Sequence, residues 1–365
     1  YIADKYVGFS HFASLGNELD VDETDMIAFF GEHPRVKVIA AYVEGIQDGE
    51  KFIRVAGEIS RHKPIVMLKA GRTGAGARAV SSHTGSLAGA YTAYQAAFKQ
   101  AGVIEVDDLP ALFDVAWALS CQPLPRGKQV AIFTNAGGPA ALASDSLAAH
   151  GFALGEITEE RKALLAQKLN PSAQVSNPVD MLGGAEPEEF EHCLSTLLEE
   201  EKIDVFLPML VPQALVDPAE VARAIVTQAA RTDKTVLACM VGEKSLEEAR
   251  RVLHENKVPM SIFPEVPGQV LGAMGWYASW LGKEREERFS FPNVNAQDLS
   301  RNITGHQGNV LGEAETRPLL AAYGLDLIPG GLAINAEEAV RIAEDTGYPV
   351  AIKIVSPQIL HKSDM

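Results

Sequence analysis

A histidine in a glycine-rich loop is the residue of this chain best suited to nucleophilic chemistry. His83 stands in the stretch 70–90, which is rich in Gly, Ser and Thr and follows the apolar run 64–69. A strand, a glycine-rich loop and a helix form the arrangement in which backbone N–H groups meet an anion. A neutral imidazole there can attack phosphorus, so we predict that His83 is catalytic and that Gly85 binds phosphate. A surface loop with an incidental histidine is the alternative.

A carboxylate that orients the imidazole would complete such a site. Glu44 follows the apolar run 36–43. Ligands of parallel sheets bind at the carboxyl ends of the strands, and both Glu44 and the His83 loop fall at such ends. We therefore predict Glu44 as a catalytic residue that holds the imidazole, with a solvated loop acid as the alternative.

A second candidate anion site begins at Asn135. The run Asn135-Ala-Gly-Gly-Pro139 links an apolar strand, 130–134, to a helix, 140–149. Proline suits the first helical turn, and two glycines let the backbone approach a ligand closely. We predict that Asn135, Gly137 and Gly138 bind phosphate; an ordinary strand-to-helix turn is the alternative.

Two more candidates lie near the carboxyl terminus. Lys353 stands inside an apolar run, 348–355, that reads as a strand, where a lysine needs an anionic partner or exposure. His361 follows on a loop.

The order of elements predicts an α/β protein with two consecutive doubly wound parallel-sheet domains of flavodoxin-like type. Short apolar strands alternate with amphipathic helices, which indicates parallel sheets covered on both faces. In the first domain we expect strands 7–15, 36–43, 65–68 and 103–106, and helices from 22, 51–61, 92–101 and 109–119. In the second we expect strands 130–134, 205–211, 236–241 and 261–263, and helices 140–149, 190–199, 219–230, 246–253 and 270–281.

Composition shifts divide the chain further. A proline-bearing joint at 122–128 separates a domain at 1–122 from one at 126–283. The charge run at 283–288 opens a linker, 284–309. Residues 310–365 form a last region, with helices 313–323 and 336–346, a strand end at 327–329 and the strand 348–355.

Bulk properties exclude several classes of protein. The chain has 365 residues and a net charge of −16, which argues against a general nucleic-acid binder. No segment has the roughly 18 unbroken apolar residues that a membrane span needs. Cys121, Cys193 and Cys239 are widely spaced in apolar surroundings, so we expect reduced cysteines, no metal site and a cytoplasmic location. The first and last residues read as the inside of a longer protein.

Taken together, these motifs resemble those of one family. The runs Ser81-Ser-His-Thr-Gly-Ser-Leu-Ala-Gly89, Asn135-Ala-Gly-Gly-Pro139 and Asn177-Pro-Val-Asp180, followed by the tail with Lys353 and His361, resemble the nucleoside-diphosphate-forming acyl-CoA synthetases. These include the ADP-forming acetate–CoA ligases, relatives of succinyl-CoA synthetase. The resemblance covers essentially the whole chain, but the CoA-binding domain of the family and most of its ATP-grasp domain are missing. The last region is then the beginning of an ATP-grasp domain.

The resemblance implies a phosphohistidine relay. Acyl-CoA and phosphate would give an acyl phosphate, and its phosphoryl group would pass to His83 and on to ADP, with Glu44 hydrogen-bonded to the histidine. Gly137 and Gly138 match a helix whose amino terminus faces the phosphohistidine. Lys353 matches a nucleotide-binding lysine, and His361 matches a second phosphate-carrying histidine.

The implied ligands are ATP or ADP with Mg²⁺, coenzyme A as substrate, a carboxylic acid and phosphate. We expect a homo-oligomer. A second hypothesis is a regulatory CoA-sensing body of a protein lysine acetyltransferase, in which the phosphorylatable histidine is often replaced. A third, a purely structural flavodoxin-like module, explains none of the motifs.

Overall fold

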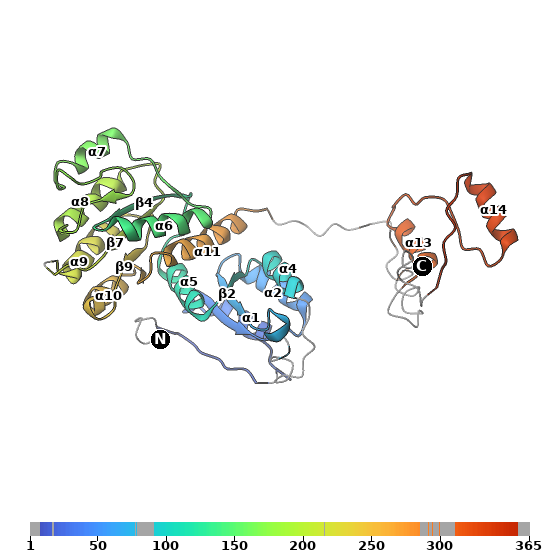
Figure 1. Ribbon diagram of the computed structural model, residues 1–365. Helices are drawn as coiled ribbons and strands as arrows, with labels where there is room; N and C mark the ends of the chain where they lie inside the picture. Colours follow the sequence, from blue (N-terminus) through green and yellow to red (C-terminus); the bar gives the residue numbers. More distant parts are fainter. Residues whose placement is uncertain are drawn as a thin grey trace. The chain divides into compact units, whose positions relative to one another are not determined.

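The computed structural model describes residues 8–16, 18–76, 78, 91–214, 216–284, 291, 294, 299 and 311–356. The chain divides into two compact units, Tyr1–Glu284 and Arg285–Met365. Figure 1 draws the elements of both. His83, Gly85 and His361 lie outside the described residues, so their roles stay predictions.

Three parallel strands form the first sheet, in the order β1-β2-β3. The elements are β1 (Ile39–Val43), β2 (Ile65–Lys69), β3 (Ile104–Val106), α1 (Glu23–Glu32), α2 (Gly49–Ile59), α4 (Tyr91–Ala101) and α5 (Leu109–Cys121). Successive side chains of a strand point to opposite faces. Ile65 and Met67 of β2 therefore pack with α1, α2 and α4, whereas Val66 and Leu68 pack with α5.

The second sheet has the flavodoxin-like strand order. Its strands are β4 (Gln129–Thr134), β5 (Ala153–Leu154), β6 (Val179–Asp180), β7 (Val205–Leu210), β8 (Thr235–Val236), β9 (Ala238–Met240) and β10 (Met260–Ser261). The order is β10-β9-β7-β4-β5, and all pairs of named strands are parallel. Since β6 lies beside β4 and β8 beside β7, five positions follow the order 2-1-3-4-5. This confirms the predicted fold class for this region.

Helices cover both faces of the second sheet. They are α6 (Gly137–Ala149), α7 (Glu159–Leu165), α8 (Pro187–Leu198), α9 (Pro218–Ala229), α10 (Glu247–Glu255) and α11 (Val266–Leu281), with a short 3₁₀ turn, η2 (Lys244–Leu246). Phe133 packs towards α8, α9 and α10, whereas Ile132 packs towards α6 and α11. Figure 1 shows these two groups of helices on opposite sides of β4. Among the described helices, none combines the length and the apolar character needed to cross a membrane.

The two sheets share one hydrophobic core. Side chains of β2, β3 and α5 belong to the same buried cluster as those of β4, β7 and α11. Helix α11 adds polar contacts, because the Tyr277 hydroxyl donates to the Ser60 carbonyl oxygen (2.7 Å). The Arg61 guanidinium lies over the Trp280 ring, 4.2 Å from its centroid. The first sheet and the second therefore form one body.

In the second unit, the predicted strand around Lys353 is absent. The unit contains α13 (Glu313–Ala322) and α14 (Ala336–Thr346), close to the predicted helices. Residues 348–356 and 327–329 have no strand structure, so both predictions were wrong. A strand is stable only when its backbone groups pair with a neighbour, and the described residues of this unit offer none.

The predicted strand at 7–15 was also wrong for its described part. Residues 8–15 form no strand, and Phe12 is 85% exposed. The ring of His11 instead packs near the rings of His33 (4.2 Å between centroids) and Phe30 (5.8 Å). The physical reason is again the lack of a ladder, because no described strand pairs with this segment.

The cysteines are free, as predicted. Cys193 and Cys239 are buried, and Cys121 is half-buried. Burial raises the pKa of Cys239 to about 11 and that of Cys121 to about 12, so these thiols stay protonated at neutral pH.

Helix α1 begins with the acidic first turn that was expected. Asp22 is the N-cap, and it exchanges hydrogen bonds with Asp25 in a capping box. Glu23, the next residue, is only 5% exposed. The Thr24 hydroxyl donates to its Oε1 (2.9 Å), but its Oε2 has no hydrogen-bond partner among the described residues. A buried carboxylate oxygen without a partner costs stability.

We expect Glu23→Gln to stabilise the protein at pH 7. Burial raises the pKa of Glu23, so the folded state binds its proton more tightly than the unfolded chain does. Stability is therefore lost as pH rises through the raised pKa, and a neutral glutamine avoids that loss. We expect a gain on the order of 1 kcal/mol in the free energy of unfolding, measured in urea, that disappears near pH 4. Glu32→Gln, an exposed change on the same helix, is the control. An unchanged or lower stability of Glu23→Gln at pH 7 would contradict the argument.

Candidate functional site

The carboxyl edge of the first sheet brings Glu44 to the start of the stretch 70–90. Strands β1 and β2 are parallel, and Val43 stands opposite Lys69. The residues that follow them, Glu44 and Ala70, therefore emerge at the same edge. The Ala70 N–H donates to the Val43 carbonyl oxygen (2.9 Å), which ties the beginning of the stretch to the end of β1.

The Glu44 side chain is half-buried and keeps hydrogen-bonding capacity. The Tyr42 hydroxyl donates to its Oε1 over a long distance, 3.5 Å. Burial, and then the Glu44 carboxylate, raise the pKa of Tyr42, so this hydroxyl remains a donor. Because a carboxylate can accept about four hydrogen bonds, Glu44 has room for an imidazole N–H.

A buried lysine, which our sequence analysis missed, lies at the same edge. Lys69 is the last residue of β2 and is 5% exposed. Its ammonium group donates to the carbonyl oxygens of Glu44 (2.9 Å) and Ala70, and it lies 4.5 Å from the centre of the Tyr94 ring. The sequence does contain an indication of this site, because a lysine stands at the end of an otherwise apolar run.

The stretch 70–90 is also anchored on its other side. The Arg72 guanidinium forms an ion pair with the Asp107 carboxylate and donates to the Asp107 carbonyl oxygen (2.6 Å). Asp107 follows β3, so the first residues of the stretch are tied to both neighbours of β2. Arg72 was not singled out from the sequence.

Asn135 holds together the strand ends of the second sheet. It follows β4, and Val211 follows β7, at the point where the strand order reverses. The Asn135 amide donates to the Val211 carbonyl oxygen and its oxygen accepts the Val211 N–H, both over 2.8 Å. With only 2% of its surface exposed, this side chain joins the ends of β4 and β7 at the switch point, the position at which ligands of such sheets bind. Phosphate binding by Asn135 stays a prediction.

Gly137 and Gly138 open helix α6. The N-cap, Ala136, offers no side-chain hydrogen bond, so it caps none of the N–H groups of the first turn. A Cβ on Gly137 would come within 2.9 Å of the Asp180 Oδ2, whereas one on Gly138 would meet nothing within 4 Å. Glycine at position 137 therefore lets Asp180 stand against the start of the helix. The helix terminus is suited to an anion, and phosphate binding here stays a prediction.

The remaining described candidate, Lys353, belongs to the second unit. Its side chain is exposed, which is the alternative to an anionic partner that the sequence left open. Among the described residues, no group of three or more His, Cys, Asp or Glu side chains could hold a metal ion.

Known families match nearly the whole chain. The models are the succinyl-CoA ligase like flavodoxin domain at residues 1–119, the ligase-CoA domain at 130–282 and the ATP-grasp domain at 302–365. An ADP-forming acetate–CoA ligase (form I) of Archaeoglobus fulgidus is 39% identical over 362 residues, which are 98% of this chain and 52% of the relative. The chain belongs to the ADP-forming acyl-CoA synthetase family.

Two more members of this synthetase family support the assignment. An ADP-forming 4-hydroxybutyrate–CoA ligase of Nitrosopumilus maritimus is 35% identical over 362 residues, which are 98% of this chain and 52% of the relative. The solved dinucleotide-forming acetyl-coenzyme A synthetase 1 of Candidatus Korarchaeum cryptofilum, in complex with phosphate and ADP, has a TM-score of 0.69 at 33% identity. That match covers 74% of this chain and 59% of the solved one. The chain spans about half the length of the curated relatives it matches.

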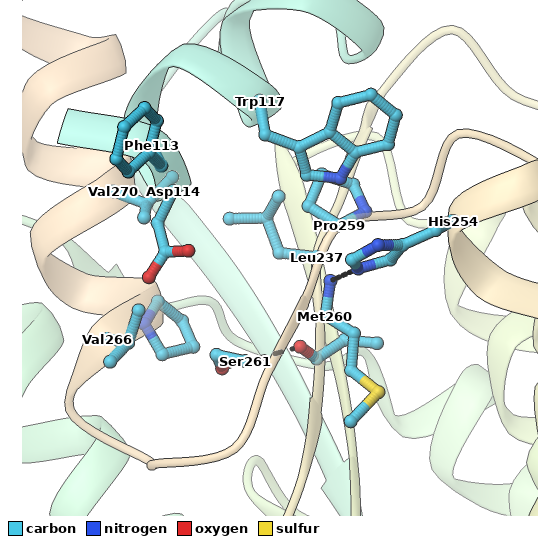
Figure 2. A pocket seen from close by; sticks show the side chains of 12 residues that line it. Phe113, Asp114, Trp117, Leu237, His254, Pro259, Met260, Ser261, Val266 and Val270 are labelled. Carbon is cyan, nitrogen blue, oxygen red and sulfur yellow. Dashed lines mark hydrogen bonds between the residues drawn. The ribbon is translucent and has the colours of Figure 1, made fainter. Parts of the chain in front are cut away.

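One pocket of the chain is too small to bind acyl-CoA. It lies between α5, the β9–β10 edge and the start of α11, and the rings of Trp117 and His254 lie next to each other on one side of it, 5.5 Å between centroids (Figure 2). The His254 Nε2 accepts the Met260 N–H (3.3 Å), and the Trp117 Nε1 has no hydrogen-bond partner among the described residues. The cavity measures about 30 Å³, which is room for about one water molecule.

A larger hollow, of about 630 Å³, follows the open edge of β3 between α4, α5 and α11. Its volume falls within the range of small-molecule sites. None of the synthetase site residues predicted from the sequence lines it. Strand β3 is at the opposite edge of the first sheet from β1, which carries Glu44.

Proposed function

We propose that this chain is the phosphoryl-transfer part of an ADP-forming acyl-CoA synthetase. The reaction interconverts acyl-CoA, ADP and phosphate with a carboxylic acid, ATP and CoA. The observation that carries the proposal is the position of Glu44, at the sheet edge where the stretch with His83 begins. The names of the relatives, which are ADP-forming ligases, support the same reaction.

The proposed chemistry proceeds in four steps. A phosphate oxygen attacks the thioester carbonyl and the C–S bond breaks; the departing thiolate takes the proton that phosphate gives up, leaving acyl phosphate and CoA. A lone pair of the His83 imidazole then attacks phosphorus, and the electron pair of the broken P–O bond leaves with the carboxylate. Next, a lone pair of the His361 imidazole attacks phosphorus and the N–P bond to His83 breaks, which leaves His83 neutral. Finally, a terminal oxygen of ADP attacks phosphorus, the N–P bond to His361 breaks, and ATP and neutral imidazole result.

Within this scheme, Glu44 accepts the N–H on the far nitrogen of the His83 ring. That hydrogen bond selects the tautomer with a lone pair facing the phosphoryl group, and it stabilises the cationic ring that forms. The proton stays on the ring throughout, so Glu44 positions and stabilises the ring without being protonated.

Anion binding is assigned to glycine-rich backbone. Gly85, Asn135, Gly137 and Gly138 would face phosphate, and the uncapped amino terminus of α6 would stabilise the phosphohistidine by about 1 kcal/mol or less. Lys353 would bind nucleotide phosphates, and His361 would carry the phosphoryl group between His83 and ADP.

The nucleotide is taken as its Mg²⁺ complex. The described side chains form no cluster that would hold the metal. We further propose that the protein is a cytoplasmic homo-oligomer. It acts on small molecules and binds neither nucleic acid nor membranes. Light scattering would measure its oligomeric state.

The proposal is tested by labelling the complete natural protein with γ-³²P-labelled ATP and Mg²⁺. We expect an acid-labile, alkali-stable phosphoprotein with the label on His83 or His361. A panel of carboxylic acids with CoA then selects the acyl group. A folded protein that binds ATP but takes up no label would refute the relay and favour the regulatory hypothesis.

A further inference from the structure

Two buried lysines stand at the two ends of strand β2. Lys63 precedes the strand and is 8% exposed, and Lys69 ends it and is 5% exposed. The Lys63 ammonium donates to three carbonyl oxygens at the end of α1, those of Phe30 (2.9 Å), Gly31 (2.6 Å) and His33 (2.9 Å). Lys63 therefore caps a helix at the amino edge of the sheet, away from Glu44.

Lys69 is buried differently, because its contacts lie at the carboxyl edge. Its ammonium holds the Glu44 and Ala70 carbonyl oxygens together and rests on the face of the Tyr94 ring. Among the described residues, no carboxylate lies within ion-pair distance of this ammonium. A buried charge that has only neutral partners is costly. Lys63 offsets this cost at the negative carbonyl end of α1, whereas Lys69 lies at the sheet edge from which Glu44 emerges.

The acidic groups that face Lys69 come from both neighbouring strands. Burial lowers the pKa of Lys69, and the charges of Glu44 and Glu105 oppose this effect. The Glu105 carboxylate already accepts a bond from the Tyr91 hydroxyl (2.6 Å), on helix α4. Glu44, at the end of β1, is the acid whose main chain Lys69 holds directly.

We infer that Lys69 is a positioning residue for phosphoryl transfer: it fixes Glu44 at the sheet edge and supplies a buried positive charge at that edge. Holding the Glu44 carbonyl sets the direction in which the Glu44 side chain leaves the strand. In the proposed scheme, the buried charge of Lys69 favours an anion that is brought to this edge, since a low-dielectric surrounding strengthens the interaction. This inference rests on the proposed function.

The test compares Lys69→Met with Lys63→Met in the complete natural protein. Both changes replace a buried lysine by an unbranched apolar side chain at an end of β2. We measure thermal stability and the rate at which γ-³²P-labelled ATP labels His83. For Lys69→Met we expect a labelling rate about tenfold lower, and for Lys69→Arg, which keeps the charge, a rate that recovers towards that of the wild type. For Lys63→Met we expect a labelling rate close to that of the wild type, whatever its stability.

The outcomes separate this inference from the proposed function. A folded Lys69→Met protein that labels at the wild-type rate overturns the inference and leaves the proposed function standing. A wild-type protein without label overturns both. If Lys69→Met does not fold, Lys69→Gln decides the question, because it removes the charge and keeps a hydrogen-bond donor: a labelling rate well below that of Lys69→Arg supports the inference, and a wild-type rate contradicts it.

Discussion

His83→Ala abolishes net acyl-CoA synthesis in the expected experiment, while the protein keeps its fold. The alanine has no lone pair to attack the acyl phosphate, so the phosphoryl group has no route to ADP. A nucleophile that forms a covalent intermediate cannot be replaced by binding energy alone, and we expect a loss of at least about 10⁴-fold. The measurement is turnover of acetyl-CoA, ADP and phosphate, or of the thioester that the acid panel selects.

Two further histidines sharpen this experiment. His62, an exposed residue just before β2, is the matched control, and His62→Ala should keep wild-type turnover. His361→Ala should block the nucleotide-dependent steps but spare the labelling of His83 by acyl-CoA and labelled phosphate. Wild-type turnover of His83→Ala would refute the relay, and equal loss of both half-reactions in His361→Ala would refute separate roles for the two histidines.

Gly102→Ala should be strongly destabilising, because two independent effects act at this position. Gly102 has φ +70°, a left-handed conformation that costs a residue with a Cβ about 1 kcal/mol. A Cβ there would lie 2.5 Å from the ring of Trp280, on helix α11, and such an overlap typically costs about 1–3 kcal/mol. We expect a loss of about 2–4 kcal/mol in the free energy of unfolding, measured in urea.

Gly57→Ala is the control for this prediction. Gly57 lies inside α2, where a Cβ would meet only the Ala101 Cα, at 3.6 Å. Alanine in a helix interior is favoured over glycine by about 0.5–1 kcal/mol, so this variant should be neutral or more stable. Trp280→Ala combined with Gly102→Ala should cost less than the sum of the two single changes. A Gly102→Ala protein as stable as the wild type would show that α11 yields at this contact.

Strands were predicted correctly from the sequence where another strand of the same chain pairs with them. Strand β4 and helix α6 were expected at nearly their observed positions, because an apolar run and a proline in the first helical turn mark them locally. Residues 8–15 and 348–355 carry the same apolar signal, yet they form no strand. Whether an apolar run becomes a strand depends on a partner elsewhere in the chain, and periodicity does not report that partner.

The candidate site also has features that the sequence predicts and features that it does not. The topology rule for parallel sheets was enough to expect Glu44 beside the stretch with His83. The bridge from Asn135 to Val211 was not predictable, because it joins residues 76 positions apart that meet only through the pairing of β4 with β7. Lys69 was missed because a charged residue at the end of a strand usually reaches solvent. Only the packing of α4 over β2 shows that the Lys69 side chain does not reach solvent.

The core common to both sheets has a mechanical consequence. Because side chains from the first and second sheets interdigitate around α5 and α11, neither sheet can swing relative to the other without opening a close-packed interior. The edge with Glu44 and the crevice with Asn135 are thus fixed points of a rigid frame. Any distance that a phosphoryl group has to cover during turnover must be covered by parts of the molecule that move over this frame, and not by a hinge within it.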